Sequence, residues 1–229
     1  MSATIEYLGH STFLIRAAGN GGGETVLVDP FLDGNPKASV SAGEVSCTRI
    51  VITHGHADHM SDAGAIAKRT GATVYAAFEI CGYLEEQGVE NLEPMNPGGT
   101  VSFADGAGSV SLVQAFHSSS FEGRYMGQPC GAIVRVGGKA VYHTGDTALF
   151  TDMKMIGERF KPDCLLVCAG DRFTMGPKDA ACAAEWIGAP IAVPMHYGTW
   201  PLLSDDMDGF TPTGIRTVLM EPGETLELD

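Results

Sequence analysis

Short apolar runs, separated by glycine, proline and small polar residues, dominate the hydrophobic pattern of the chain. Runs of this length that are rich in β-branched and apolar residues are typical of β-strands. Thirty glycines and twelve prolines are spread along the chain, and a glycine-rich turn is expected at 19–23. The pattern predicts strands at residues 3–8, 12–16, 25–28, 49–53, 73–76, 110–116, 132–136, 139–142, 164–168, 191–194 and 215–220.

Three segments have helical periodicity instead, namely 59–69, 79–87 and 178–187. Each is followed by a glycine (Gly71, Gly88 and Gly188), which adopts the left-handed conformation of a helix C-cap at little cost. Strands outnumber helices and alternate with them along the chain. The predicted fold class is therefore α/β or α+β with extensive sheet.

The length of the chain limits the number of domains, and its net charge argues against some classes of function. The chain has 229 residues, which suggests one large domain or at most two small ones, because a domain averages roughly 150 residues. Its 28 acidic and 14 basic residues give a formal charge of −14. Such an imbalance argues against a nucleic-acid binder, since affinity for phosphates comes mostly from Lys and Arg. It argues equally against binding to an anionic membrane surface.

The N-terminal sequence, the short apolar runs and the cysteines lead us to expect a cytoplasmic protein. The N-terminus lacks the basic and apolar regions of a secretory signal, and no apolar run approaches the ~18 residues of a membrane span. The six cysteines contain no Cys-x-x-Cys pair, and four lie in apolar or helical stretches. We therefore expect buried thiols in a reducing compartment rather than disulfides or a cysteine-based zinc site.

Metal-binding residues are concentrated where the apolar run 49–53 ends. The next residues are His54-Gly-His56-Ala-Asp58-His59, followed by a predicted helix. Ligand sites in open sheets commonly lie at such strand ends. His54 and His56 leave the strand together and could bind one ion, whereas Asp58 and His59 could reach a second.

Three further predicted strands end at a side chain that can bind metal: His117, Asp146 and His196. His117 would complete a three-histidine site with an open fourth position, as in catalytic zinc sites. His196 would join Asp58 and His59 on a second ion, and Asp146 could bridge the two. Mixed imidazole and carboxylate ligands suit zinc, manganese or iron. We expect two divalent cations, zinc first, with manganese or iron as alternatives.

These residues together resemble the metallo-β-lactamase superfamily. Flanking segments are similar to metal-dependent hydrolases grouped near L-ascorbate-6-phosphate lactonase, with N-acyl-phosphatidylethanolamine phospholipase D more distant. The segments are Tyr7-Leu-Gly-His10-Ser, Leu27-Val-Asp29-Pro, Tyr142-His143-Thr-Gly-Asp146-Thr and Pro194-Met-His196-Tyr-Gly-Thr-Trp200-Pro. The resemblance runs from residue 5 to about 220. It implies a single domain over 1–229, a four-layer αββα sandwich with the metals at one edge, and the same ligand set.

The expected function is a binuclear metal-dependent hydrolase. A metal-bridging hydroxide, positioned by Asp58 and Asp146, would attack an ester, lactone or phosphodiester. One rival is a mononuclear iron dioxygenase or another redox enzyme on the same scaffold, although the flavodiiron pattern has Glu where this chain has His56. The other rival is a non-catalytic metal-binding protein, against which the complete ligand set argues.

Two histidines and the residues around the site have more than one interpretation. His10 and His143 are candidate catalytic residues: each could orient a ligand carboxylate or donate a proton to the leaving group, and each could equally be structural. The resemblance makes Asp29 a supporting or turn-forming residue rather than a ligand. Arg124 or Tyr125 could border the active-site mouth or simply decorate the surface, and Tyr197 and Trp200 could line the substrate pocket or pack in the core.

The expected partner is a small-molecule substrate. Two divalent cations with two carboxylates leave the site about +2, opposite in sign to the whole chain. The substrate can therefore be anionic. The sequence leaves self-association open, so a homo-oligomer stays among the expected partners.

Overall fold

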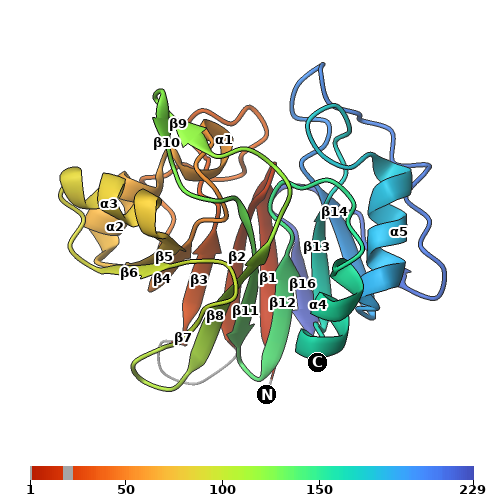
Figure 1. Ribbon diagram of the computed structural model, residues 1–229, viewed down its shortest axis with the longest axis horizontal. Coiled ribbons are helices and arrows are strands. Elements are labelled where there is room, and N and C mark those ends of the chain that lie inside the picture. The colour runs from red at the N-terminus through yellow and green to blue at the C-terminus, as the bar shows by residue number, and fades with distance from the viewer. Residues whose placement is uncertain (1, 18–22) are drawn as a thin grey trace.

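The computed structural model describes residues 2–17 and 23–229, so the glycine-rich turn expected at 19–23 lies outside the described residues except for Gly23. Two seven-stranded sheets pack against each other, and helices cover the outer face of each sheet (Figure 1). The predicted α/β class and its four-layer αββα arrangement are confirmed.

The first sheet contains most of the N-terminal half. The pairs β1–β2 and β2–β3 are antiparallel, whereas β3–β4, β4–β5 and β5–β6 are parallel. In spatial order the strands are β16 (Thr225–Leu228), β1 (Ala3–Gly9), β2 (Thr12–Ala17), β3 (Thr25–Val28), β4 (Arg49–Val51), β5 (Thr73–Ala77) and β6 (Leu92–Met95).

The second sheet repeats this pattern. Three antiparallel pairs, β7–β8, β8–β11 and β11–β12, are followed by three parallel pairs. In spatial order the strands are β15 (Arg216–Thr217), β14 (Ile191–Met195), β13 (Cys164–Cys168), β12 (Lys139–His143), β11 (Cys130–Val136), β8 (Gly108–Gln114) and β7 (Thr100–Ser102). A separate hairpin joins β9 (Ser120–Phe121) and β10 (Arg124–Tyr125).

Helices pack on both outer faces. Figure 1 shows α2 and α3 on the first sheet and α4 and α5 on the second. The bounds are α1 (Ala57–Met60), α2 (Ala63–Thr70), α3 (Phe78–Glu86), α4 (Met153–Phe160) and α5 (Pro177–Ile187). The predicted glycine caps are confirmed for α2 and α5, whose left-handed C-caps are Gly71 and Gly188 with φ of 73° and 71°. The C-cap of α3 is Gln87, and the left-handed Gly88, with φ of 82°, follows it. In the described chain no helix has the length and apolarity needed to cross a bilayer.

Alternating burial along the strands builds two apolar layers. In the first sheet Ile5, Phe13 and Val26 face the second sheet and belong to the cluster between the sheets. Leu14 and Leu27, on the opposite face, pack with the helices. Fully burying one such side chain stabilises the fold by about 1.5–3 kcal/mol, so the two-residue period of the sequence decides which face each strand presents to each layer.

One predicted helix, 59–69, is broken in the structure. The Asp62 carboxylate accepts hydrogen bonds from the backbone N–H groups of Leu32 and Asp33, at 2.5 and 3.1 Å. The Asp62 N–H in turn donates to the carbonyl of Pro30. These contacts with the loop after β3 separate α1 from α2, and the sequence pattern gave no sign of them.

Several short elements were not predicted. Helix α4 has Gly157 in its interior, which lowers intrinsic helix propensity. That glycine is required by packing, because a Cβ there would lie 2.2 Å from the carbonyl oxygen of Ile187 in α5. The strands β6, β7 and β16 have three or four residues each, and β15 has two where six were expected at 215–220. Such short edge strands carry too little hydrophobic pattern to recognise.

Candidate metal centre

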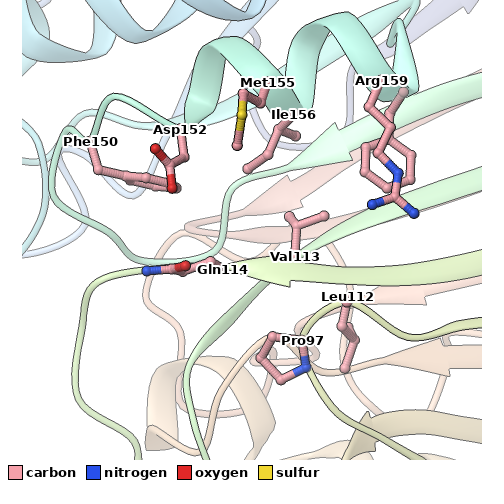
Figure 2. A pocket seen from close by; sticks show the side chains of 11 residues that line it. Pro97, Leu112, Val113, Gln114, Phe150, Asp152, Met155, Ile156 and Arg159 are labelled. Carbon is pink, nitrogen blue, oxygen red and sulfur yellow. The ribbon is translucent and has the colours of Figure 1, made fainter.

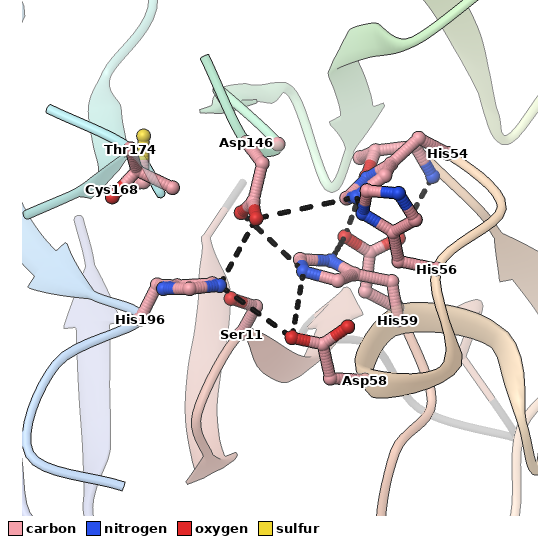
Figure 3. A network of polar contacts seen from close by, with 12 residues as sticks. Ser11, His54, His56, Asp58, His59, Asp146, Cys168, Thr174 and His196 are labelled. Carbon is pink, nitrogen blue, oxygen red and sulfur yellow. Dashed lines mark hydrogen bonds and ion pairs between the residues drawn. The ribbon is translucent and has the colours of Figure 1, made fainter. Parts of the chain in front are cut away.

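The loops that follow several strands meet at one edge of the sandwich, and the structure brings all seven predicted ligand residues together there. Figure 3 labels all of them except His117. Each belongs to the start of a loop or helix directly after a strand. The residues are His54, His56, Asp58 and His59 after β4, His117 after β8, Asp146 after β12 and His196 after β14.

One group consists of three histidines. His54, His56 and His117 each offer a nitrogen, and these nitrogens lie within 4.8 Å of one another. His54 is fully buried, while His56 and His117 are partly exposed. Three imidazoles with an open side toward solvent are the ligand arrangement of a catalytic zinc site.

A second group adds carboxylate to imidazole. Asp58, His59 and His196 lie within 4.8 Å of one another through their ligand atoms, and His10 belongs to the same group. The Asp58 Oδ2 atom is 3.6 Å from His196 Nε2 and 3.9 Å from His59 Nε2.

Asp146 lies between the two groups. Its Oδ2 atom is 3.6 Å from His117 Nε2 and 4.0 Å from His54 Nε2 on one side, and 3.0 Å from His196 Nε2 on the other. Its Oδ1 atom is 3.3 Å from His59 Nε2. This is the position that a carboxylate bridging two cations requires.

The polar atoms at the centre lack hydrogen-bond partners. Among the described residues, His59 Nε2, His196 Nε2 and Asp146 Oδ1 are buried and make no hydrogen bond. They approach one another without the alignment of a hydrogen bond, so they surround a common point. An unsatisfied buried polar atom costs about 1–3 kcal/mol, and a cation at that point would satisfy all three. The donor set therefore fits bound metal.

Asp29 sets the proton positions of two histidines. Its Oδ2 atom is 2.7 Å from His59 Nδ1 and accepts a 2.7 Å hydrogen bond from the Thr53 hydroxyl. Having donated its proton, the Thr53 Oγ1 accepts from His54 Nδ1 at 3.0 Å. With metal bound, both rings would carry the proton on Nδ1 and turn the Nε2 lone pair toward the site, as metal-binding histidines require. Asp29 thus supports the ligands rather than joining them.

The electrostatics of the metal-free site also favour a cation. Burial alone would lower the pKa of His196, but the carboxylates of Asp146 and Asp58 raise it to about 9. For His59 burial acts downward too, yet Asp146, Asp29 and Asp58 hold its pKa well above the usual value. His54, whose burial dominates, has a strongly lowered pKa. Protons therefore balance the carboxylates when no metal is bound, and a metal would displace them.

The two uncertain histidines separate in the structure. His143 donates from Nε2 to the carbonyl of Ser11 at 2.9 Å and accepts at Nδ1 from the N–H of Gly145 at 3.1 Å. Both of its nitrogens are used by the backbone. His10 instead contacts side chains, with Nε2 3.2 Å from Asp58 Oδ2 and Nδ1 2.9 Å from Thr199 Oγ1.

The residues proposed to border the active site differ in whether they contact the metal centre. Arg124 makes two hydrogen bonds to the Glu86 carboxylate on α3, and Tyr125 is 69% exposed. Trp200 packs against the ring of His10 with centroids 4.8 Å apart. Trp200 therefore contacts the site, whereas Arg124 is engaged elsewhere.

Sequence reasoning missed four residues of the site. The Ser118 hydroxyl is 3.3 Å from His56 Nε2, and Thr199 contacts His10. A Cβ at Gly55 would lie 2.2 Å from Met126, and one at Gly170 would lie 1.9 Å from the carbonyl oxygen of His196. The available signal was adjacency, because Gly55 and Ser118 each neighbour a predicted ligand and Gly170 closely follows a strand.

Comparison with known proteins agrees with this geometry. The family model of the β-lactamase superfamily domain matches residues 24–197. A UPF0173 metal-dependent hydrolase of Shouchella clausii is 46% identical over 233 residues, covering 98% of this chain and 99% of that protein. Igni18, a metallo hydrolase from Ignicoccus hospitalis, has a TM-score of 0.88 at 33% identity, covering 100% of this chain and 99% of its own.

The fold extends to more distant proteins. CmlA, a diiron β-hydroxylase from Streptomyces venezuelae, is 17% identical with a TM-score of 0.74, covering 99% of this chain and 54% of its own. At that identity the likeness concerns the fold alone. The match to the family model and the 46% identity go further. The chain belongs to the metallo-β-lactamase superfamily and, within it, to the UPF0173 metal-dependent hydrolases.

Proposed function

We propose that this protein uses two divalent cations to hydrolyse an ester, lactone or phosphodiester bond in a small molecule, and that it does so in the cytoplasm. The observation that supports a binuclear site best is the position of Asp146, whose Oδ2 atom lies within 4.0 Å of nitrogens from both ligand groups. Five buried cysteines without a disulfide among the described residues support a reducing compartment.

The ligands divide into two sets. His54, His56 and His117 would hold one cation, whereas Asp58, His59 and His196 would hold the other, with Asp146 shared. Zinc is the metal we expect first, with manganese and iron as alternatives. When bound, two such cations supply acidification of water and polarisation of the substrate oxygen that develops negative charge.

The chain's own residues orient the reactants. Asp146 is nearly fully buried, whereas the Asp58 side chain is 25% exposed, so the two carboxylates approach an entering water from the inner and the outer side. The ring of Trp200 packs 5.9 Å from Phe31 and 4.8 Å from His10, forming an aromatic wall beside the second ligand group. The local charge of about +2 with both metals bound favours an anionic substrate.

Elemental analysis of the purified protein, paired with a hydrolysis screen, tests this function. We expect two divalent metal ions per chain and activity on at least one class among esters, lactones and phosphodiesters, with amides and thioesters screened for comparison. Asp146→Ala should abolish the activity and reduce the metal content. Asp105→Ala is the matched control. Asp105 lies in the β7–β8 turn, where it pairs with Arg49 of β4 and belongs to neither ligand group. Undiminished metal-dependent activity in Asp146→Ala would contradict the mechanism.

The same measurements separate the rival functions. A single iron per chain, with oxygen consumption on a thiol substrate, would support a mononuclear dioxygenase instead. Bound metal with no turnover of any substrate class would support a non-catalytic metal-binding protein. The shared position of Asp146 favours a binuclear site over a mononuclear one.

A further inference from the structure

A threonine outside the ligand set is connected to a ligand carboxylate through one imidazole ring. The Thr199 hydroxyl is 2.9 Å from His10 Nδ1, and His10 Nε2 is 3.2 Å from Asp58 Oδ2. Thr199 is 6% exposed and His10 is fully buried, so water does not replace these contacts easily. The three side chains come from segments separated by 48 and 189 residues.

We propose that the Thr199 hydroxyl, by donating to His10 Nδ1, holds the His10 ring so that its Nε2–H orients the Asp58 carboxylate toward the second cation. Thr199 and His10 are then positioning residues for a metal ligand. The inference rests on the proposed binuclear site, since it assigns to Asp58 the task of binding a cation.

The donors and acceptors along this path allow one arrangement in a neutral ring. An ionised carboxylate only accepts hydrogen bonds, so the contact with Asp58 needs a proton on His10 Nε2. Nδ1 then presents a lone pair, and the hydroxyl of Thr199 must donate to it. The other acceptor near that hydroxyl, the carbonyl of Tyr197, is farther away at 3.4 Å.

The ring of His10 is held in place from several sides. Its backbone has φ of 58°, and its carbonyl accepts hydrogen bonds from the N–H of His196 and the hydroxyl of Tyr7. The ring packs 4.1 Å from the His196 ring and 4.8 Å from that of Trp200. A non-glycine residue in this conformation is strained, and these contacts maintain it. The ring is therefore held where its Nε2–H can donate to Asp58.

The arrangement complements the one at Asp29. There a carboxylate orients the ligand imidazole of His59, whereas here an imidazole orients a ligand carboxylate. The Asp58 Oδ2 atom that His10 contacts is also the oxygen that faces His59 Nε2 and His196 Nε2, so this contact fixes the oxygen that borders the second cation. Partners of this kind typically change metal affinity 10–100-fold when they are removed.

Zinc titration of the metal-free protein tests the proposal. Thr199→Val keeps the shape of the side chain and removes the hydroxyl, while Thr199→Ser restores it. We expect Thr199→Val to weaken the second zinc about 10–100-fold and to leave the three-histidine site unchanged. Thr199→Ser should behave like the unsubstituted protein. Equal binding of two zinc ions by Thr199→Val and the unsubstituted protein would overturn the proposal.

A double-variant cycle adds a readout that loss of packing does not imitate. His10→Asn suits the left-handed backbone but shortens the side chain, and it should weaken the second zinc to a similar degree. If Thr199 acts through His10, adding Thr199→Val to His10→Asn causes no further loss. Additive losses would overturn the proposal. Failure of the unsubstituted protein to bind a second zinc would instead refute the proposed function.

The proton position is also directly observable. Nitrogen-15 spectra of the histidine rings, with the His10 signal identified by its absence in His10→Asn, should show the proton on Nε2 in the unsubstituted protein. In Thr199→Val the proton should stay on Nε2, because Asp58 still accepts it, while the Nδ1 signal should move as that nitrogen loses its hydrogen-bond donor. A proton already on Nδ1 in the unsubstituted protein would contradict the inference.

An independent observation concerns the side of α4 that borders β8. A cavity of about 310 Å³ lies between this helix and β8, lined by apolar residues that include Leu112, Val113 and Ile156. Figure 2 shows Asp152 and Arg159 at opposite ends of this cavity, with Met155 between them. Met155 is 62% exposed, and in the described chain neither charged residue has an ion-pair partner.

We infer that a second copy of this chain docks on this face, with the two α4 helices antiparallel. Asp152 and Arg159 are equally distant from the midpoint between Met155 and Ile156, so a twofold axis there brings each Asp152 opposite the Arg159 of the other copy. A surface that is self-complementary in this way is what a twofold dimer needs. The Met155 side chains would enter the facing cavities, which suits a flexible apolar residue.

Charge reversal tests the dimer by sedimentation equilibrium. The unsubstituted protein should be a dimer, and Asp152→Arg or Arg159→Asp alone should be monomeric. The two substitutions combined should restore the dimer, because the ion pairs re-form with opposite polarity. Lys154→Glu is the control on the same helix, since Lys154 lies over the ring of Trp186. A monomeric unsubstituted protein, or a doubly reversed variant that stays monomeric, would overturn the inference.

Discussion

Three residues at the ends of strands bear the strain of the site. His10, Asp29 and His196 have φ of 58°, 48° and 60°, a conformation that costs a non-glycine residue roughly 1–2 kcal/mol. Each turns the chain sharply after a strand and directs its side chain inward. The hydrogen bonds around Asp29 and the carbonyl of His10 hold two of these turns. Strain of this kind is concentrated where geometry serves function.

At this scale we predict the effect of Asp29→Asn. Asparagine tolerates the left-handed backbone and has the same size, so the fold should persist. The amide has one acceptor oxygen, so its NH2 group must face either the Thr53 N–H or the pair formed by the Thr53 hydroxyl and His59 Nδ1. The network that fixes the proton positions of two ligand rings is then broken. Zinc affinity should fall about 10–100-fold, measured by titration of the metal-free protein.

The chemically matched control for Asp29→Asn is Asp105→Asn, which lies at the β7–β8 turn and pairs with Arg49. It should bind zinc like the unsubstituted protein. Unchanged affinity in Asp29→Asn would show that the rings keep their orientation without the carboxylate.

The strands that precede the ligands were predicted from their two-residue hydrophobic period. The helices and turns that connect these strands were predicted less completely. Helix α4 and the break at Asp62 depend on contacts with other elements, Ile187 for the former and the loop after β3 for the latter. Burial in the core of the sandwich reinforces the local pattern of a strand. A turn that is held by a distant backbone has no such local pattern.

Replacing a glycine by alanine should change the free energy of unfolding in opposite directions in two of the helices. Gly157→Ala in α4 should destabilise the protein by about 1–3 kcal/mol, because the new methyl group overlaps the backbone of Ile187 and this outweighs the better helix propensity. Gly82→Ala in α3 has open space around it and should stabilise by up to about 1 kcal/mol. Urea denaturation of both variants checks the signs, and a stabilised Gly157→Ala would mean that α4 and α5 can separate.

The buried cysteine thiols should be unreactive while the protein is folded. Burial raises the pKa of Cys81, Cys130 and Cys164 to about 12, and that of Cys47 and Cys168 to about 11. A raised thiol pKa leaves almost no thiolate at pH 8, and thiolate is the reactive form.

Ellman's reagent should therefore modify one cysteine rapidly in the folded protein, the partly exposed Cys182, and all six after denaturation. Cys182→Ser should remove the rapid phase. Several rapidly reacting thiols in that variant would show that the core opens frequently.

For the whole molecule, metal binding and stability are linked. A ligand that binds only the folded state at 100 times its dissociation constant stabilises it by about 2.7 kcal/mol. In a protein of this size such an increase raises Tm by roughly 5–10 °C. We expect zinc to raise Tm by this amount and EDTA to reverse it. Asp146→Ala should respond much less, and an equal response would place the stabilising zinc elsewhere.

Residues of the site that lie close together in the sequence could be predicted, whereas contacts between residues far apart in the sequence could not. His54, His56, Asp58 and His59 occupy six consecutive residues, and the strand before them is visible in the hydrophobic pattern. Both features are local, so the sequence by itself determined the strand, its end and the metal-binding character of that end. The residues His117, Asp146 and His196 were nominated because each follows a strand, and the structure brings them to the same edge.

Only the tertiary structure decided which side chains touch. Asp29 lies 30 residues from His59, and His10 lies 189 residues from Thr199, yet both pairs are in hydrogen-bond contact. Sheet order and the register of neighbouring strands produce these contacts, and neither is encoded in any local pattern. Periodicity tells where a strand ends and which face it buries, because those depend on adjacent residues. The partner of a side chain depends on which strand lies beside it, and the packing of the whole chain decides that.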